Sequence, residues 1–250
     1  MNSFTGTTEQ AASDSRPVAL IAGATGGVGQ QCTFDLIRAG YRVVALSRSD
    51  TKLEDLSRRA LEAGPAGSLI TLRADITAAQ AAQHIRQNVE RKLGRLDLLL
   101  LSAGITSNKS TGLSDTEVTT VISSNLTGPM LLIDELIPLL MKAEQPYVVS
   151  VASRAGKTGF SDKGLYGASK AGLLLYVQSL TAVPALKKIR FTSLCPGWIN
   201  TDMARTGGCR LPAEDLLQPE DISSLVLWLT ASSPRVRIGE IIIEPAQVNR

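Results

Sequence analysis

Short apolar runs alternate with longer stretches of helical periodicity along almost the whole chain. The strand-like runs lie at residues 18–22, 41–47, 68–73, 96–101, 147–152, 189–194 and 240–244. The helical stretches lie near residues 27–39, 51–63, 77–93, 114–142, 164–182 and 219–231. Several strand runs, such as VALIA and LDLLLL, are apolar on both faces, as strands covered by helices above and below must be. The alternation predicts an α/β fold in which about seven strands form one doubly wound parallel sheet with helices on both faces.

The alternation continues without a linker or a break in composition over residues 17–245, so we predict a single domain there. Residues 1–16 are polar. They have neither the apolar core of a signal peptide nor the acid-poor, arginine-rich composition of a transit peptide. We therefore predict a disordered N-terminal tail over residues 1–16 and the cytoplasm as the compartment.

Charge, histidine and cysteine usage exclude several classes of function. The net charge is +3 and the basic residues form short, scattered pairs, which favours solvated helix faces over a nucleic-acid surface. A single histidine, His84, leaves a Ser-His-Asp hydrolase or a histidine metal site little to build on. The three cysteines lack CxxC spacing, and the apolar runs are shorter than the ~20 residues of a membrane span. We expect no metal, no nucleic acid and no membrane partner.

The segment AGATGGVG, residues 22–29, directly follows the first strand-like run. Glycines at 23, 27 and 29 keep side chains out of a strand-to-helix turn, and Gly26 adds further freedom. A pyrophosphate can then approach the helix N-terminus, where free N–H groups and the helix dipole favour anions. A merely flexible turn is the alternative, but the position between a buried strand and an apolar-periodic helix favours dinucleotide binding.

The end of the second strand reads ALSRSD, residues 45–50. Folds that prefer NAD place an acidic residue here to bind the ribose 2′-hydroxyl. This chain has Ser47 and Arg48 instead, and a guanidinium beside a small hydroxyl suits a 2′-phosphate. Asp50 is the competing candidate, although it lies beyond the expected strand end, and surface charge is the alternative for both charged residues. We predict NADP (NADPH) as the cofactor.

Seven motifs follow one another along the chain. They are GATGGVG (23–29), ADIT (74–77), LSAG (101–104), SSNLTG (123–128), VSVASRAG (149–156), YGASK (166–170) and PGWINTDM (196–203). In this order they resemble the short-chain dehydrogenase/reductase family over residues 17–245, and they point to its NADP-preferring, 3-oxoacyl reductase-like branch. The resemblance implies a single-domain Rossmann fold and an enzyme that acts on CH–OH or C=O groups.

The motif positions give the candidate site. The resemblance implies the catalytic residues Asn125, Ser153, Tyr166 and Lys170. Together with the turn and strand-end arguments it gives the cofactor-binding residues Gly23, Thr25, Gly26, Gly27, Val28, Gly29, Ser47, Arg48, Asp75, Ile76, Ser102, Ala103, Gly104, Tyr166, Lys170, Pro196, Gly197, Ile199 and Thr201. Packing roles for Ser153, Asn125 and Tyr166 are the alternative, but all fall at the family spacing. The resemblance also implies that Asn125 holds a water relay behind Lys170.

Reduction of a carbonyl by hydride transfer builds an alkoxide that needs a proton, and a phenol can donate it. Free tyrosine has a pKa of about 10, so working near neutral pH requires a shift worth ~4 kcal/mol. An ammonium ~4 Å away supplies ~1 kcal/mol in water and ~4 kcal/mol at an effective dielectric constant near 20. Tyr166 and Lys170 share one helix face, at positions i and i+4. We therefore expect Lys170 to lower the pKa of Tyr166 in a partly dehydrated site.

The predicted function is NADP(H)-dependent reduction of a ketone, an aldehyde or a 3-oxoacyl-type carbonyl to an alcohol, with Tyr166 as the proton donor. The alternative is a catalytically silent, dinucleotide-binding regulatory protein of the same fold. A sugar-nucleotide epimerase of the extended branch needs a second domain that 250 residues do not accommodate. The resemblance implies a small-molecule carbonyl or alcohol substrate and a homodimer or homotetramer, formed by the helices after the fourth and fifth strands.

An apolar substrate wall and a mobile lid are expected near the catalytic tyrosine, with a packing role as the equal alternative for each residue. The lid is the stretch from Asp202 to Gln218, which contains Gly207 and Gly208. The wall residues are expected to be Phe160, Leu165, Trp198, Met203, Leu211, Leu216 and Leu217, with Arg154, Arg205 and Arg210 as possible polar contacts. The chain departs from the family pattern at Ser102, which stands where an asparagine is usual, and at Pro184, which should end or kink the preceding helix.

Overall fold

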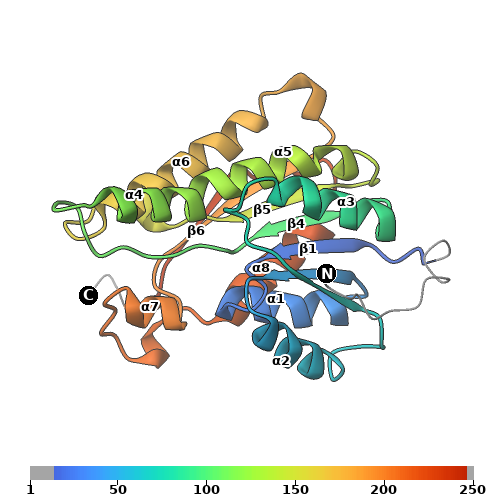
Figure 1. Ribbon diagram of the computed structural model, residues 1–250, viewed down its shortest axis with the longest axis horizontal. Helices are drawn as coiled ribbons and strands as arrows, with labels where there is room; N and C mark the ends of the chain where they lie inside the picture. The colour runs from blue at the N-terminus through green and yellow to red at the C-terminus, as the bar shows by residue number, and fades with distance from the viewer. Residues whose placement is uncertain (1–13, 247–250) are drawn as a thin grey trace.

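All strands pair in parallel in the computed structural model, which describes residues 14–246. Within that range one sheet has seven strands in the order β3-β2-β1-β4-β5-β6-β7 (Figure 1). They are β1 (Val18–Ala22), β2 (Arg42–Ser47), β3 (Leu69–Arg73), β4 (Leu98–Leu101), β5 (Tyr147–Val151), β6 (Arg190–Pro196) and β7 (Glu240–Ile243). The order turns back between β1 and β4, which makes the sheet doubly wound and confirms the predicted fold.

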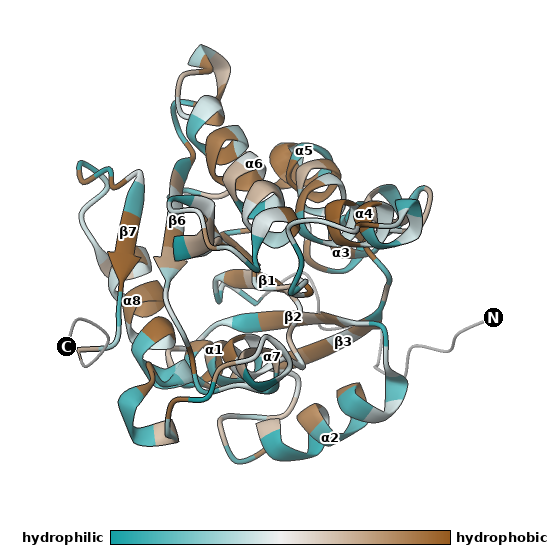
Figure 2. Cartoon of the chain, turned by 90° about the vertical axis from the view of Figure 1, so that its left-hand side faces the viewer, coloured by the Kyte–Doolittle hydropathy of each residue, from teal (hydrophilic) through white to brown (hydrophobic). Residues whose placement is uncertain are grey.

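Helices cover both faces of the sheet (Figures 1 and 2). The helices α3, α4, α5 and α6 lie over one face, and α1, α2 and α8 lie over the other. The bounds are α1 (Gly27–Arg38), α2 (Asp50–Ala60), α3 (Ala81–Leu93), α4 (Asp115–Ile122), α5 (Gly128–Leu140), α6 (Gly164–Leu180), α7 (Asp202–Thr206) and α8 (Pro219–Ala231). Across residues 14–246, no helix has both the length and the apolar character that crossing a bilayer requires.

Successive residues of the central strands alternate between two buried clusters. Leu20 and Leu99 belong to the cluster that includes residues of α5 and α6. Their neighbours Ile21 and Leu100 belong to the cluster that includes residues of α1 and α8. Side chains point to opposite faces along a strand, so a strand that is buried on both sides must be apolar throughout. This is why the runs read as continuous apolar segments in the sequence.

The helical stretch predicted over residues 114–142 is present from Asp115 to Leu140, and it contains one π-helical turn. A π-helical turn over Ser123–Thr127 separates α4 from α5. Pro129 has no backbone N–H to donate to the carbonyl four residues earlier, at Asn125, so a regular α-helical bond cannot form there. Gly128 packs tightly at the same point, because a Cβ on it would lie 2.9 Å from the Ile76 carbonyl oxygen. Asn125 lies in this π-helical turn and is buried in the interior.

The structure describes the last residues of the predicted N-terminal tail and the end of α6. The tail predicted over residues 1–16 lies outside the described residues up to position 13. Its last residues are described: Arg16 forms an ion pair with Asp14 and donates a hydrogen bond to Ser68 at 2.9 Å. The helix α6 ends at Leu180, ahead of Pro184, as that proline predicted.

The turn between β1 and α1 depends on two glycines for different reasons. Gly23 has a φ of +85°, and a Cβ on it would lie 2.6 Å from the Ala103 backbone nitrogen. A Cβ on Gly29 would lie 2.2 Å from the Gly23 carbonyl oxygen. The first requirement is a left-handed backbone and the second is close packing of the helix on the strand. By contrast, the nearest atom to a Cβ on Gly26 would be 3.5 Å away.

We expect Gly29→Ala to lower the free energy of unfolding by about 1–3 kcal/mol, because the new methyl group must displace the backbone of the turn. The matched control is Gly26→Ala in the same turn, where a methyl group has room and the loss should stay below about 0.5 kcal/mol. Urea unfolding of the three proteins measures both values. Equal losses for the two variants would show that the turn does not depend on this contact.

Candidate active site

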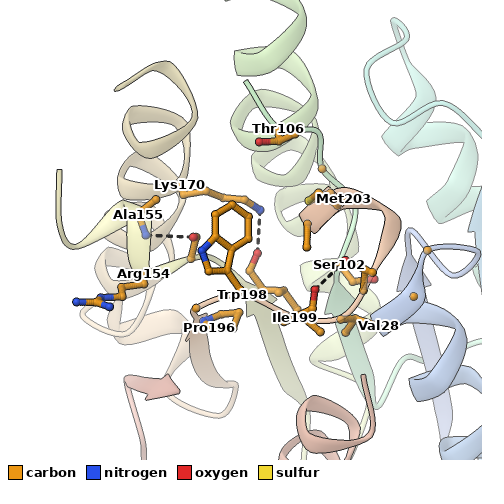
Figure 3. A pocket seen from close by; sticks show the side chains of 18 of the residues that line it. Val28, Ser102, Thr106, Arg154, Ala155, Lys170, Pro196, Trp198, Ile199 and Met203 are labelled. Atoms are coloured by element: carbon orange, nitrogen blue, oxygen red, sulfur yellow. Dashed lines mark hydrogen bonds between the residues drawn. The ribbon is translucent and has the colours of Figure 1, made fainter. Parts of the chain in front are cut away.

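A cavity of about 410 Å³ opens beyond the carboxyl ends of the central strands. Its lining comes from the turn after β1, from the residues that follow β4, β5 and β6, and from the first two turns of α6. Its position matches the reversal of strand order between β1 and β4, where the connections leave in opposite directions and open a crevice. Figure 3 shows Ser102, Lys170 and Trp198 approaching this cavity from three different elements.

Most of the predicted residues line this cavity. They are Thr25, Gly26, Gly27, Val28, Gly29, Ser102, Gly104, Ser153, Tyr166, Lys170, Pro196, Gly197, Ile199 and Thr201. Gly23 and Ala103 pack against each other directly behind the lining. The hydroxyl of Ser102 donates a hydrogen bond to the Ala22 carbonyl at 2.9 Å, so serine supports this loop where the family usually has asparagine.

The residues predicted to meet the adenosine half lie at the ends of β2 and β3, outside the cavity lining that the structure describes. The hydroxyls of Ser47 and Thr25 are hydrogen-bonded at 2.8 Å, which links the end of β2 to the glycine turn. Burial opposes ionisation of Asp75. Hydrogen bonds from Thr77 and the charge of Arg48 nevertheless hold the pKa of Asp75 below its ordinary value. Arg48 is exposed and therefore accessible to an anion.

Ser153 and Tyr166 both line the cavity. Ser153 follows β5, and its Oγ accepts a hydrogen bond from the Ala155 backbone N–H at 3.1 Å (Figure 3). Tyr166 lies in the first turn of α6. Burial raises the pKa of Tyr166, and its side-chain hydrogen bond with Ser153 opposes this increase only in part. The phenol is therefore protonated at neutral pH.

Lys170 lies one helical turn beyond Tyr166 and is buried. Its Nζ donates a hydrogen bond to the Val151 carbonyl at 2.9 Å and lies 5.9 Å from the centre of the Tyr166 ring. Burial lowers the pKa of Lys170 to about 8. The expectation that Lys170 lowers the pKa of Tyr166 was wrong for this structure. The ammonium is turned toward the β5 carbonyl, and loss of hydration of the phenol dominates.

Asn125 lies behind the cavity and is completely buried. Its Oδ1 accepts a hydrogen bond from the Ile105 backbone N–H at 2.8 Å, and its Nδ2 donates to the Ile105 carbonyl at 2.9 Å. The same Nδ2 donates to the Ser169 hydroxyl at 3.0 Å. Gly104 lies between Asn125 and Lys170, because a Cβ there would be 3.0 Å from the amide oxygen and 3.3 Å from the ammonium. The carboxamide thus joins the loop after β4 to α6.

Comparison with known proteins agrees with this arrangement. The family model described as short chain dehydrogenase matches residues 17–208. The chain belongs to the short-chain dehydrogenase family. Members of this family are oxidoreductases, so this protein is an oxidoreductase.

Some proteins similar to this short-chain dehydrogenase are named as 3-oxoacyl reductases, and others only as oxidoreductases. A 3-oxoacyl-[acyl-carrier-protein] reductase of Bos taurus is 30% identical over 75% of this chain and 78% of its own length. An uncharacterized oxidoreductase of Staphylococcus saprophyticus is 25% identical over 91% of this chain and 97% of its own. The solved structure of a β-ketoacyl-[ACP] reductase from Bacteroides thetaiotaomicron has a TM-score of 0.81 and 28% identity, and covers 93% of this chain and 98% of its own.

The substrate end of this short-chain dehydrogenase differs from the expected apolar wall. Of the predicted wall residues, Phe160, Trp198 and Met203 line the cavity. Among the described residues, Leu165, Leu211, Leu216 and Leu217 lie outside the lining, as do Arg205 and Arg210. Leu165, Leu216 and Leu217 are buried away from the cavity and Leu211 is exposed. The sequence does not show which face of a short loop is turned inward.

Polar residues that the sequence did not indicate complete the lining of the substrate end. They include Thr106, Lys163 and Glu244. Arg154 lines the cavity as predicted and forms an ion pair with Glu244, which comes from the segment after β7. Of these, only Lys163 had a usable signal, because it lies three residues before Tyr166 in the sequence. Glu244 is distant in sequence from every motif.

The pKa of Lys170 predicts a pH-dependent stability. Lysine has a pKa of 10.5 in the unfolded chain and about 8 when folded, so between these values only the unfolded state binds the proton. The free energy of unfolding therefore rises with pH in this window. Lys170→Met removes the titrating group. We expect the stability of the native protein relative to that variant to rise by about 2 kcal/mol between pH values of about 7.5 and 9.5 in urea unfolding. A constant difference would contradict the burial of a charged lysine.

Proposed function

We propose that the protein is an NADPH-dependent carbonyl reductase that converts a ketone, an aldehyde or a 3-oxoacyl-type carbonyl to an alcohol. One observation carries the proposal. A protonated Tyr166 phenol, hydrogen-bonded to Ser153, lies in the same cavity as the glycine turn after β1. The names of the bovine and Bacteroides relatives support a 3-oxoacyl-type substrate as one member of this class.

The turn at the start of α1 fits a dinucleotide. The N-cap of α1 is Gly26, which has no side chain to occupy the free backbone N–H groups of the first turn. The first turn also carries no acidic residue that would repel a phosphate. These N–H groups face the cavity through Gly26 and Gly27, and with the helix dipole they would hold a pyrophosphate.

The end of β2 supports NADP rather than NAD. Ser47 and Arg48 stand where a ribose-binding carboxylate would otherwise lie, and Ser47 is already linked to the turn through Thr25. The exposed Arg48 guanidinium would bind the 2′-phosphate through charge-assisted hydrogen bonds. Asp75, next to Arg48, would contact the adenine. Another short-chain dehydrogenase, from Shigella flexneri, was solved in complex with NADP and has a TM-score of 0.85, 24% identity and coverage of 95% and 99% of the two chains.

In the proposed reaction, NADPH supplies a hydride to the carbonyl carbon. Tyr166 donates its phenolic proton to the carbonyl oxygen as negative charge develops there. The Ser153 hydroxyl orients that oxygen and stabilises the same charge by hydrogen bonding. Lys170, charged below a pH of about 8, would bind the nicotinamide ribose hydroxyls while Val151 holds its Nζ in place. Asn125 positions the loop after β4, and it would hold the water that returns a proton through Lys170.

The raised pKa of Tyr166 bears on its role as a proton donor. Reduction consumes a proton and needs the phenol, whereas oxidation of an alcohol needs the phenolate. Burial raises the pKa of Tyr166, so the donor form dominates near neutral pH. The proton that reduction consumes is therefore present on Tyr166.

The proposed assembly follows from two exposed leucines on the helices after β4 and β5. Leu131 of α5 is 55% exposed and Leu175 of α6 is 63% exposed. Both belong to the face that the resemblance assigns to a subunit interface, so we propose a homodimer or homotetramer that covers them. We propose in addition that residues 17–245 form one domain and that the protein acts in the cytoplasm.

We expect Tyr166→Phe to lower kcat by at least about 10²-fold while leaving the dissociation constant for NADPH within about twofold, because only the proton donor is removed. NADPH oxidation across ketones, aldehydes and β-keto thioesters measures turnover, and quenching of tryptophan fluorescence measures binding. Tyr176→Phe, on the same helix but outside the cavity lining described above, is the matched control and should keep full activity. Near-normal turnover in Tyr166→Phe would show that Tyr166 is not the proton donor. A wild type that reduces none of these substrates would favour a catalytically silent dinucleotide-binding protein.

We expect Arg48→Ala to weaken NADPH binding by about 10–100-fold and NADH binding by less than about twofold, since the lost contact is a charge-assisted hydrogen bond to the 2′-phosphate. Isothermal titration with each dinucleotide gives both values. Arg38→Ala removes a similar exposed guanidinium at the far end of α1 and should change neither. An equal loss for the two dinucleotides in Arg48→Ala would show that Arg48 does not read the 2′-phosphate.

A further inference from the structure

The chain between β6 and α8, residues 197–218, covers the substrate end of the cavity, and we call it the cover segment. Trp198, Met203 and Ala204 of this segment line the cavity. The two ends of the segment are joined, because the Leu217 N–H donates to the Trp198 carbonyl at 3.1 Å and the Asn200 N–H donates to the Leu217 carbonyl at 2.8 Å. These hydrogen bonds fix the base of the cover segment. The position of its tip, Thr206 and Gly207, depends on contacts with residues outside the segment.

Those contacts come from Lys163 and Asn108 on the opposite side. Lys163 immediately precedes α6 and is 6% exposed. Its Nζ donates hydrogen bonds to the Gly207 carbonyl at 2.7 Å and to Oδ1 of Asn108. Asn108 Nδ2 in turn donates to the Thr206 carbonyl at 3.0 Å. Two side chains from outside the cover segment thus bind two consecutive carbonyls at its tip.

The carbonyls at this point need partners. Thr206 is the last residue of α7 and Gly207 is its C-cap, so their oxygens point beyond the helix end. The protein supplies an ammonium and an amide there, and a positive charge at a helix C-terminus is favourable. The Lys163 Nζ also lies 5.7 Å from the centre of the Trp198 ring, which is the main apolar surface of the segment.

The burial of Lys163 depends on the cover segment being closed. A buried ammonium needs its hydrogen bonds, because it has lost its hydration. Asp162 offers it only a distant, exposed carboxylate, with 3.6 Å between the charged atoms. When the segment lifts, the Gly207 carbonyl leaves, Asn108 Oδ1 remains the nearest acceptor, and the ammonium is exposed to water. Opening of the cover segment therefore requires loss of the hydrogen bonds to the Thr206 and Gly207 carbonyls.

We propose that Lys163 and Asn108 are positioning residues that clasp the cover segment closed and thereby fix the wall formed by Trp198 and Met203. They act on the substrate through the segment and not on the reacting atoms. Closure then sets the size of the substrate end of the cavity, and release of the clasp precedes entry or exit of a bulky group. The clasp exists whatever reaction the site performs.

Limited proteolysis tests the clasp without any ligand. Arg205 and Arg210 are exposed trypsin sites on the cover segment. Lys163→Met keeps most of the apolar stem and removes the ammonium. We expect trypsin to cut after Arg205 and Arg210 about tenfold faster in this variant, which corresponds to about 1.4 kcal/mol of easier opening. Mass spectrometry of the fragments identifies the two cuts.

Lys109→Met is the matched control, because Lys109 lies on the same loop as Asn108 but pairs with Glu117 at 2.9 Å. This control should be cut at the wild-type rate. Asn108→Ala is a second, exposed variant that should accelerate the cuts even if Lys163→Met folds poorly. If both act through one clasp, the double variant will be cut no faster than about twice the rate of the faster single variant. Wild-type cutting rates in two folded single variants would overturn the proposal.

A kinetic measurement adds a second readout, which rests on the proposed function. With a ketone that the wild type reduces, we expect Lys163→Met to raise KM about tenfold and to change kcat less than threefold, because the wall is lost and the proton donor is kept. An equal fall of kcat and kcat/KM would contradict a positioning role. If the wild type reduces no carbonyl, the proposed function fails while the proteolysis result still decides whether the clasp exists.

Discussion

The close approach of the glycine turn to the end of β4 is the constraint on which the site depends. A Cβ on Gly23 would collide with the Ala103 backbone at 2.6 Å, so the two chain segments touch with no side chain between them. That contact, with the parallel pairing of β1 and β4, brings the N-terminus of α1 beside the loop after β4. The opening left at the reversal of strand order is then one cavity that the glycine turn shares with Ser153, Tyr166 and Lys170.

Burial controls the charges in this cavity more strongly than pairing does. The Lys170 ammonium is held by the Val151 carbonyl, and its pKa falls to about 8. The Tyr166 phenol is hydrogen-bonded to Ser153, and its pKa still rises. A shared helix face indicates that two side chains are neighbours. It does not indicate which acceptor the cation selects or how much water remains, and in a low dielectric those two facts decide the pKa values.

Two kinds of interaction hold the cavity on its two sides. On the side of the glycine turn, backbone and small side chains pack closely, as at Gly29 and Ser102. The substrate side is assembled from the cover segment, whose tip is attached by the polar contacts of Lys163 and Asn108. Packed backbone cannot separate without loss of the fold, whereas a few hydrogen bonds can be broken singly. The substrate end can therefore open without disturbing the packing of the glycine turn.

The sequence by itself determined the sheet, its strands and most of the residues around the cavity, because apolar runs and glycine spacing are local patterns that the backbone must follow. It did not determine the π-helical turn that buries Asn125, the direction of the Lys170 ammonium, or the pairing of Arg154 with Glu244. The Lys170 and Arg154 contacts depend on partners elsewhere in the chain, and the π-helical turn combines the local effect of Pro129 with the packing of Gly128 against Ile76. Only the tertiary structure decides which distant carbonyl, carboxylate or ring lies within reach of a side chain, and hydrogen bonds and dehydration act over a few ångströms.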